Sequence, residues 1–300
     1  MPLTGTMNKV LVTILLSGCS LTSLRGQDFI DSMFFDRNWE QTQRDNASYY
    51  RIVRTSPDGS FLLMVEDHFL SGQIQMTGTY RSIRPDYKEG LFTYWYENGN
   101  KQAECEYKDN ELNGHYSEWY ENGSQKTSQY FKKGILNGTY QSWNNDSNPK
   151  LNVQYVDGKR HGYFISYYPN GKPVRKDLYE NDELIEGKCF NEKEEPVAYF
   201  PYIIMPAFNG GITALRSFIQ KEMQYPRNAL RSGVQGVVIT RFTVDENGNI
   251  RGAEVIQGDR DDFNAEALRI INSFPQWIPG KIDNQPAPVQ VSLPIEFTID

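Results

Sequence analysis

A glycine that recurs at a nearly constant spacing is the feature that most constrains how this 300-residue chain can fold. Gly90, Gly114, Gly138, Gly162 and Gly187 lie 24, 24, 24 and 25 residues apart. A fixed period of this size is typical of stacked supersecondary units, each of which buries its apolar face only against its neighbours. We therefore expect residues 60–192 to form one repeat array.

The units share one order of residue types. The units that begin at Gly90, Gly114 and Gly162 have an aromatic residue two positions after the glycine, an aromatic pair three positions after that, and Asn-Gly at the end. The unit at Gly138 keeps Tyr140 and Trp143 but has Asn145–Asp146–Ser147 in place of Asn-Gly. In the first repeat these positions are Gly90, Phe92, Trp95–Tyr96 and Asn98–Gly99. Asn and Gly both tolerate positive φ, so the pair predicts a type I′ turn between two strands of roughly six residues. A second turn, at Asp109–Asn110 in this unit, would join one hairpin to the next in an antiparallel meander.

The composition agrees with a mainly β protein. The chain has 19 Tyr and 16 Phe, which suit pleated sheets better than helices. Its formal net charge is -7, and its Lys and Arg residues are interleaved with acids. A phosphate backbone attracts clustered basic residues, so we expect no binding to nucleic acid.

A second aromatic row runs through the repeats at Trp95, Trp119, Trp143 and Tyr167. These side chains would lie along one face of the sheet. Their expected role is to pack neighbouring hairpins together, since an isolated hairpin is not stable. The alternative is an open platform of rings that stacks on a glycan.

The spacing and residue types of the units resemble the MORN-type repeat, in its bacterial YwqK-like variant. The resemblance covers about residues 60–190. It implies a scaffold or interaction surface without a shared chemistry. A cytoplasmic antitoxin role, which the same resemblance would allow, fits poorly with the N-terminal segment described below.

After residues 193–206, which we take as a linker, the pattern changes to one with helices. Apolar residues at 212, 215, 218 and 219 predict a helix that ends before Tyr225–Pro226. Strands are expected at 236–244 and 250–257, and a second helix follows Asp261 and Asp262, which can cap it. Strict alternation predicts a last strand over 289–299. The fold class is therefore an antiparallel β-hairpin meander followed by a small α+β domain of order helix, strand, strand, helix, strand.

This C-terminal pattern resembles the C-terminal domain of the TonB energy-transducer family over residues 207–300. The residues that carry the resemblance are Tyr225–Pro226, Gly233, Gly236, Asn247–Gly248, Trp277, Pro279–Gly280 and Leu293–Pro294–Ile295. The resemblance implies a periplasmic domain that captures a short segment of an outer-membrane receptor by strand addition. An energy transducer is also expected to have a His-containing membrane helix and a long proline-rich spacer. Neither is seen here, which puts coupling to a proton-driven motor in doubt.

The proline in the last strand indicates where a partner would dock. Successive residues of a strand direct their N–H and C=O groups to opposite sides, and a proline is tolerated where its side is an open edge. Pro294 therefore predicts that the even positions face an open edge. The candidate partner-binding residues are Gln290, Ser292, Glu296 and Thr298. The alternative is that Pro294 protects this edge from pairing with anything.

The N-terminal segment predicts export. Residues 10–24 are apolar, follow Lys9 and are interrupted by small residues, so residues 1–26 have the profile of a signal peptide. Leu16–Ser17–Gly18–Cys19 resembles a lipobox, in which the Cys19 thiol would be acylated. Cleavage near Gly26 without lipid is the equal alternative, and a membrane anchor at 10–24 is a marginal third. Residues 27–59 show no clean periodicity and form a lead-in segment.

No chemistry of an enzyme is expected. His68, His115 and His161 lack companions at metal-ligand spacing, so we predict no metal site, no cofactor and no catalytic residue. Cys105 and Cys189 are seven strands apart in the expected meander, too far for a disulfide. The sequence thus predicts a periplasmic or cell-envelope adaptor, either released or membrane-attached, whose partner is an outer-membrane receptor or other envelope protein. The alternative is a structural module that binds glycan or peptidoglycan.

Overall fold

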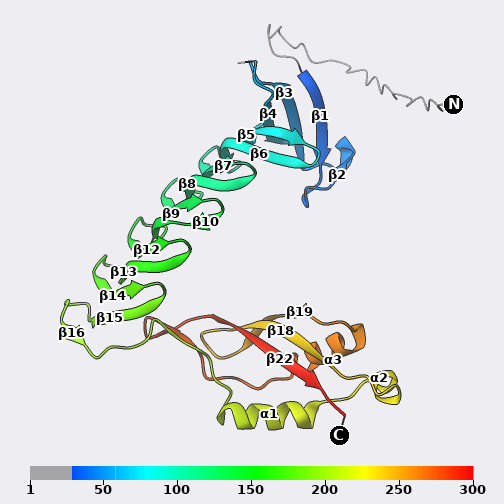
Figure 1. Ribbon diagram of the computed structural model, residues 1–300, viewed down its shortest axis with the longest axis vertical. Coiled ribbons are helices and arrows are strands. Elements are labelled where there is room, and N and C mark those ends of the chain that lie inside the picture. The colour runs from blue at the N-terminus through cyan, green and yellow to red at the C-terminus, as the bar shows by residue number, and fades with distance from the viewer. Residues whose placement is uncertain (1–28, 58, 300) are drawn as a thin grey trace, which may run out of the picture. The chain divides into compact units, whose positions relative to one another are not determined.

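The computed structural model describes residues 29–57 and 59–299 (Figure 1). The candidate signal at 1–26, its apolar run at 10–24 and the candidate lipidation residue Cys19 lie outside these residues. The chain divides into two compact units, one ending at Gly114 and one beginning at His115. We describe each unit by itself.

The first unit consists of antiparallel strands. They are β1 (Phe29–Phe35), β2 (Gln41–Thr42), β3 (Tyr49–Thr55), β4 (Leu63–Phe69), β5 (Ile74–Ile83), β6 (Asp86–Trp95), β7 (Lys101–Lys108) and the start of β8 (Glu111–Trp119), with a 3-10 turn at Arg44–Asn46. From β3 to β7 each strand lies next to its successor in the sheet, whereas β1 lies between β3 and β2. The lead-in segment at 27–59 therefore contributes three strands for which the sequence shows no periodicity.

The second unit begins with the later repeats. Their strands are β9 (Gln125–Lys132), β10 (Ile135–Leu136), β11 (Gly138–Trp143), β12 (Pro149–Val156), β13 (Lys159–Tyr167), β14 (Pro173–Glu180), β15 (Glu183–Phe190) and β16 (Pro196–Val197). Apart from β10, which pairs with β9 beside this path, the strands follow one another in chain order in the sheet, and their pairings are antiparallel. The predicted fold class, a long antiparallel meander, is confirmed.

The type I′ turn predicted for the Asn-Gly tips is wrong. At the Asn-Gly tips only the glycine has positive φ, 87° at Gly99, and its N–H bonds to the carbonyl of Tyr96 at 2.9 Å. This is a four-residue turn that ends in a left-handed residue, not a type I′ turn. Both central residues have positive φ instead at the second turns, with 53° at Asp109 and 66° at Asn110. The type I′ geometry belongs to these second turns because they join strands without an intervening bulge.

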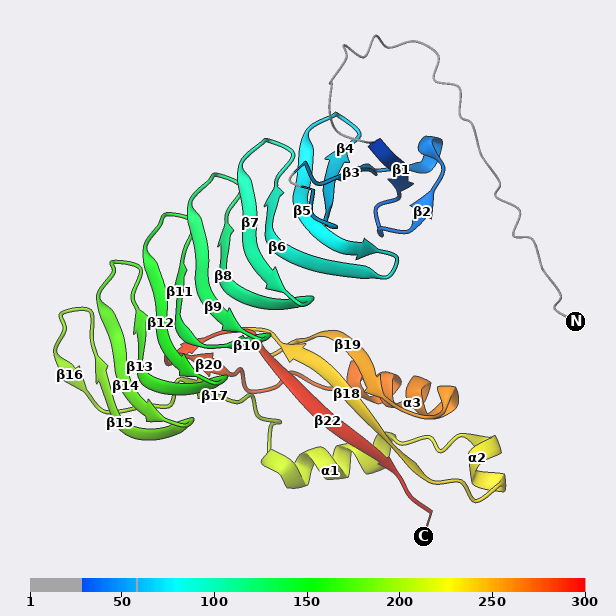
Figure 2. The ribbon, with the colours of Figure 1, turned by 45° about the horizontal axis from the view of Figure 1, so that its top comes forward.

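The repeat glycines occupy irregular positions inside strands. Gly90, Gly114, Gly138 and Gly162 have φ of 83°, 135°, 102° and 109°. Next to Gly90 and Gly162 the pairing with the preceding strand shifts register, between Thr77 and Thr79 and between Val153 and Tyr155. Such β-bulges increase the local bend of a strand, and Figure 2 shows the long repeat strands curling.

Gly187 is not a member of this series. Its φ is not positive, and a Cβ there would come within 2.2 Å of the Tyr199 ring. The 25-residue interval before Gly187 thus marks a glycine that makes room for an aromatic side chain rather than one that bends a strand.

Ring contacts run along the aromatic row that lies two residues after each repeat glycine. Phe92 contacts Tyr107 at a centroid distance of 5.1 Å, Tyr116 contacts Phe131 at 6.0 Å, and Phe164 contacts Tyr179 at 6.2 Å. Phe92 is fully buried and Phe164 is 5% exposed. The row of Trp95, Trp119, Trp143 and Tyr167 is only half-buried. It is therefore neither the main packing layer of the repeats nor a fully open platform.

The C-terminal part of the second unit has the expected order of elements. They are β17 (Ile203–Ile204), α1 (Gly211–Glu222), α2 (Arg227–Arg231), β18 (Gly236–Val244), β19 (Ile250–Gln257), α3 (Asp261–Asn272), β20 (Lys281–Ile282), β21 (Gln285–Pro286) and β22 (Val289–Phe297). One sheet has the order β19-β18-β22 and a small one the order β17-β20-β21. The short elements α2, β17, β20 and β21 have no counterpart in the sequence prediction.

A core of aromatic and aliphatic side chains closes this domain. Phe242, Phe263, Ile270, Ile295 and Phe297 are each at most 2% exposed and belong to one cluster. The helix α3 begins one residue after Arg260, so Asp261 and Asp262 lie in its first turn and not at the N-cap as predicted. Acidic residues there still interact favourably with the helix dipole. The Asp262 carboxylate also accepts the N–H of Phe263 at 3.0 Å.

The two cysteines of the described residues are free and buried, as predicted. Burial raises the pKa of the Cys105 thiol to about 11. His115 and His161 are exposed, and the half-buried His68 ring stacks on Tyr50 at a centroid distance of 4.8 Å.

Removal of the Phe92 ring tests the packing row. Phe92→Ala should lower the free energy of unfolding by about 3–5 kcal/mol, because the ring is fully buried between Tyr80 and Tyr107. Leu91→Ala is the matched control, since Leu91 is the adjacent residue and is 52% exposed; its effect should stay below about 0.5 kcal/mol. Urea denaturation of the full chain measures both. Equal effects would contradict this assignment of the packing row.

Candidate functional site

A groove lies between the helix α1 and the strand β22 at one side of the C-terminal domain. Its volume is about 800 Å³. The helix runs beside the strand in both views of the fold (Figures 1 and 2). The lining residues are Ile212, Leu215, Arg216, Ile219, Gln220, Met223 and Tyr225 on the helix side and Leu293, Pro294, Glu296, Phe297 and Thr298 on the strand side.

The helix wall of the groove is an apolar stripe. Ile212, Leu215, Ile219 and Met223 are spaced by three or four residues and therefore share one face of α1. Leu215 is 5% exposed and belongs to the domain core, whereas Ile212 is 61% exposed. An exposed aliphatic side chain on a groove wall offers apolar surface that a bound segment can cover.

The strand wall of the groove is β22, which is an edge strand of its sheet. β22 pairs with β18 along its whole length, from Gly236 opposite Phe297 to Val244 opposite Val289. Its other side pairs with no strand of the described residues 29–57 and 59–299. Pro294 stands opposite Ile239 and has no N–H, so this pair is a non-hydrogen-bonded one. The even positions of β22 thus direct their main-chain groups away from β18.

The groove brings two of the four predicted partner-binding residues together. Glu296 is exposed on β22 and Thr298 is exposed just beyond the end of the strand, and both line the groove. Gln290 and Ser292 are exposed on the same strand but are not part of the lining. The alternation predicted for the strand is confirmed at Ile295 and Phe297, which are buried.

The helix wall was missed by sequence reasoning. The apolar spacing of residues 212, 215, 218 and 219 was used only to predict that a helix forms. Exposure of Ile212 shows that the stripe extends past the core. Only the position of α1 along the edge of β22 makes it a groove wall.

Polar contacts at the end of α1 hold the helix in place. The N–H of Gln224 donates to the Glu266 carboxylate on α3 at 2.6 Å. Arg269 donates to the same carboxylate at 2.8 Å and to the Glu222 carbonyl. The Tyr225 hydroxyl donates to the Val234 carbonyl at 2.6 Å. These contacts connect the end of α1 to the core before any ligand binds.

A buried ion cluster connects the repeats to the C-terminal domain within the second unit. Arg175 on β14 is 0% exposed. Its guanidinium donates to Asp177 at 2.8 Å, to Asp283 at 2.7 Å and to the Phe200 carbonyl at 2.6 Å. Asp283 lies in the turn between β20 and β21, so one side chain links the repeat strand, the linker and the C-terminal domain.

Aromatic rings enclose this cluster. The Arg175 guanidinium carbon lies 5.6 Å from the ring centroid of Tyr199 and 5.5 Å from that of Tyr202. The Tyr202 ring also packs on Phe164 at 4.6 Å. Burial raises the pKa of Tyr202 to about 12. Burial also raises the pKa of the Asp177 carboxyl, and Arg175 opposes that shift. The predicted linker at 193–206 thus contributes Tyr199, Phe200 and Tyr202 to this cluster, while most of its other side chains are exposed.

No group of three or more His, Cys, Asp or Glu side chains in the described part of the chain could hold a metal ion. No helix within residues 29–57 and 59–299 is long and apolar enough to cross a membrane.

Comparisons with known proteins match both parts of the chain. Residues 221–299 match the family described as the Gram-negative bacterial TonB protein C-terminal. Residues 88–109 and 160–181 match the MORN repeat variant. Both resemblances are confirmed: the C-terminal part is similar to the TonB C-terminal family, and two of the repeat units are similar to the MORN repeat variant.

A solved structure similar to the chain is the solution structure of the Helicobacter pylori TonB C-terminal domain. It is 23% identical, with 30% of this chain and 80% of that chain covered, at a TM-score of 0.24. No curated protein sequence matches the chain.

Loss of Arg175 tests the buried cluster. Arg175→Ala should lower the free energy of unfolding by about 3–5 kcal/mol, because Asp177 and Asp283 lose the cation that compensates their burial. The control is Lys188→Ala on the adjacent strand β15, which breaks the exposed pair with Glu186 and should leave the urea midpoint unchanged. If both variants unfold at the midpoint of the unaltered protein, the cluster does not hold the two parts together.

Proposed function

We propose that the C-terminal domain binds an extended segment of an outer-membrane receptor or other envelope protein, which joins the sheet as a new strand along the free edge of β22. The observation that carries the proposal is the coincidence of a strand edge and an apolar helix wall in one groove. The TonB-like match of residues 221–299 supports it.

The groove offers both parts of a strand-addition site. Main-chain groups of the edge strand supply affinity, and pockets for alternate side chains supply specificity. Positions 290, 292, 296 and 298 direct their N–H and C=O groups outward, and Pro294 interrupts this series. In the added strand, every second side chain would point to the same face of the sheet as Ile295 and Phe297. Those side chains would cover the exposed part of Ile212 on α1.

The charges of the groove favour a segment without a large net charge. Its lining contains one basic side chain, Arg216, and one acidic side chain, Glu296. Both are exposed, so they act at the rim and not at a buried position. A partner segment therefore gains its affinity from main-chain hydrogen bonds and apolar contacts, and charge pairs set its register.

The rest of the chain serves this role as a scaffold in the cell envelope. The repeats carry the binding domain through the packed joint at Arg175, and the N-terminal segment exports the chain and attaches it or releases it. On this proposal the protein is an adaptor and not an enzyme.

A proline scan of the edge tests the docking site. Glu296→Pro removes one outward N–H within the groove, whereas Glu296→Ala, the matched control, removes the carboxylate and keeps the N–H. A photo-crosslinker at position 212 of the full chain, in envelope extract, first identifies the contacted peptide. Calorimetry with the synthetic peptide should then show about fivefold weaker binding to Glu296→Pro, since a main-chain hydrogen bond contributes roughly 1 kcal/mol.

The control variant Glu296→Ala should bind the peptide within about twofold of the unaltered protein, because a charge at the rim of the groove contributes little. Circular dichroism establishes that each variant folds. Ser292→Pro lies outside the groove lining and should weaken binding less than Glu296→Pro does. Unchanged affinity of a folded Glu296→Pro variant would exclude docking at this edge.

Export and attachment are tested by the mass of the native protein. Intact mass spectrometry should show a start at Cys19 with added lipid or a start near Gln27 without it. Either form agrees with export through a cleaved signal. A mass that begins at Met1 or Met7 would contradict cleavage and would leave residues 10–24 as an anchor.

A further inference from the structure

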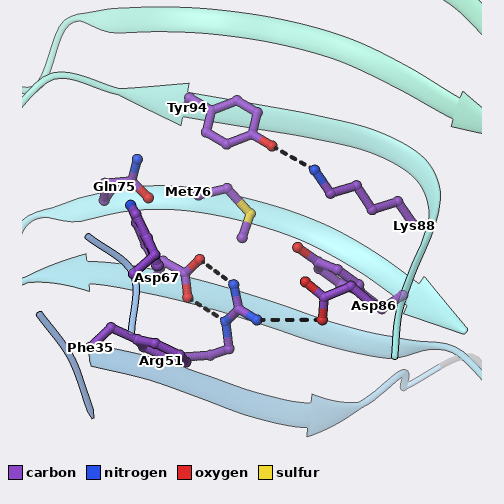
Figure 3. Close-up of a pocket in the computed structure, with 10 residues that line it drawn as sticks. Phe35, Arg51, Asp67, Gln75, Met76, Asp86, Lys88 and Tyr94 are labelled. Carbon is purple, nitrogen blue, oxygen red and sulfur yellow. Dashed lines mark hydrogen bonds and ion pairs between the residues drawn. The ribbon is translucent and has the colours of Figure 1, made fainter. Parts of the chain in front are cut away.

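The first unit contains a second pocket, which the proposed function does not use. Its volume is about 310 Å³ (Figure 3). Aromatic and charged side chains line it together. They are Phe35, Trp39, Arg51, Asp67, Gln75, Met76, Tyr80, Asp86, Lys88 and Tyr94.

The polar side of the pocket is built around a fixed ion pair. Arg51 on β3 donates from Nε and Nη2 to the two carboxylate oxygens of Asp67 on β4, at 2.7 and 2.9 Å. Arg51 is 8% exposed and Asp67 is 1% exposed. The third nitrogen, Nη1, lies 4.0 Å from Asp86, and Figure 3 shows the guanidinium between the two carboxylates. Both oxygens of Asp67 are occupied, so Arg51 is held in one orientation with Nη1 directed away from Asp67.

The charges of the pocket balance. Arg51 and Lys88 contribute two positive charges, and Asp67 and Asp86 contribute two negative ones. The pocket therefore offers hydrogen-bond donors and acceptors side by side without a net charge that would select an ion. Gln75 adds a buried side-chain oxygen that has no hydrogen-bond partner among the described residues. An unpaired buried acceptor is costly, and a ligand hydroxyl would satisfy it.

The aromatic side of the pocket contains a backbone outlier. Trp39 has φ of 62° and is 39% exposed. It ends a turn in which the Asp36 N–H bonds to the Glu40 carbonyl and the Trp39 N–H bonds to the Asp36 carbonyl. Large side chains rarely adopt positive φ, because Cβ approaches the carbonyl oxygen that follows it.

Other turns in the described residues show what this position normally holds. Seven turns share the same pair of main-chain hydrogen bonds, and their left-handed residues are Gly72, Gly99, Gly123, Ser147, Gly171, Glu194 and Gly248. None of the seven is aromatic. Trp39 is held by stacking on Tyr49 at a centroid distance of 4.6 Å and by contact with Phe35 at 5.6 Å. Strain of this kind, retained beside a pocket, points to a role in ligand contact.

We propose that this pocket binds a neutral saccharide ring, with Trp39 as the stacking residue and Arg51, Asp86 and Gln75 as hydrogen-bonding residues. A sugar ring has apolar C–H faces that pack on aromatic rings and hydroxyl groups that both donate and accept. That combination matches a lining with aromatic walls and balanced donors and acceptors. The volume lies at the lower end of the range for small-molecule pockets, about 300–1,000 Å³, and suits one ring rather than a long chain.

Saturation-transfer NMR with the mature full-length chain tests the proposal. The probes are the methyl glycosides of glucose, galactose, mannose and N-acetylglucosamine, with glucuronate and glucosamine as charged comparisons. We expect saturation transfer to the ring C–H protons of at least one neutral sugar and weaker transfer to both charged sugars. Weaker transfer to the neutral sugars than to a charged one would overturn the proposal.

Two substitutions of Trp39 separate binding from folding. Trp39→Gly places at this turn the residue that five of the seven equivalent turns contain, so the fold should be kept. It should weaken sugar binding about tenfold or more through loss of the stacking ring. Trp39→Phe keeps an aromatic face and should bind within about fivefold of the unaltered protein.

Trp143→Ala, in the half-buried row of the second unit, is the control for the alternative glycan platform and should leave sugar binding unchanged. Loss of binding in Trp143→Ala with binding kept in Trp39→Gly would place the saccharide on the repeat face and overturn the proposal. Absence of saturation transfer to every neutral sugar would also overturn it. None of these results depends on the strand-addition site, which lies in residues 207–299.

Discussion

Positive φ is the backbone constraint on which the repeats depend. A residue with a Cβ pays a steric cost in this region, so each repeat needs glycine or a short polar residue at fixed points. Gly90 and Gly162 sit beside β-bulges, Gly99 ends the tip turn, and Asp109–Asn110 form the type I′ turn to the next unit. The bulges curl the strands, and ring contacts such as Phe92 on Tyr107 pack neighbouring strands together. The 24-residue period thus reflects the backbone conformation that the repeat glycines allow as well as the spacing of the packed rings.

The same constraint makes the exceptions informative. Trp39 occupies a turn position that glycine holds in most of the equivalent turns, and Gly187 stands one residue out of phase because Tyr199 needs its space. Both departures coincide with a local arrangement that the repeat pattern does not require. At Trp39 that arrangement is a pocket with balanced charges, and at Gly187 it is the start of the packed joint around Arg175. Departures from a periodic sequence rule are expected at sites that have a local function or a local packing constraint of their own.

In the C-terminal domain the packed core leaves one strand edge exposed. Its core closes around Phe242, Phe263, Ile270 and Phe297 and leaves one strand edge without a partner. A free edge is a hazard for a folded protein, and Pro294 limits it by removing one donor. The groove beside α1 turns the remaining donors and acceptors into a site with a defined apolar wall. Restriction of the edge by Pro294 and docking at the edge are therefore compatible, since the proline interrupts only one even position.

Local sequence patterns by themselves determined the meander, the five main elements of the C-terminal domain and the inward face of β22. The strands 236–244 and 250–257 match the structure residue for residue, because the tight turn that separates them is a local property of the sequence. The type I′ turn predicted for Asn-Gly was wrong, because only the glycine of these tips has positive φ, whereas both residues of Asp109–Asn110 do. Asp261 and Asp262 were predicted to cap the second helix, but the N-cap is Arg260 and both acids lie in the first turn.

Only the tertiary structure decided which surfaces become sites. Of the four edge residues inferred from Pro294, the structure joins Glu296 and Thr298 with α1 in one groove and leaves Gln290 and Ser292 outside its lining. Arg175 donates a hydrogen bond to Asp283, which is 108 residues away, and Arg51 donates one to Asp67 on the next strand. Periodicity specifies which face of an element is apolar, because that depends on neighbours three or four residues away. It does not specify which distant element covers that face, because that choice depends on packing of the whole domain.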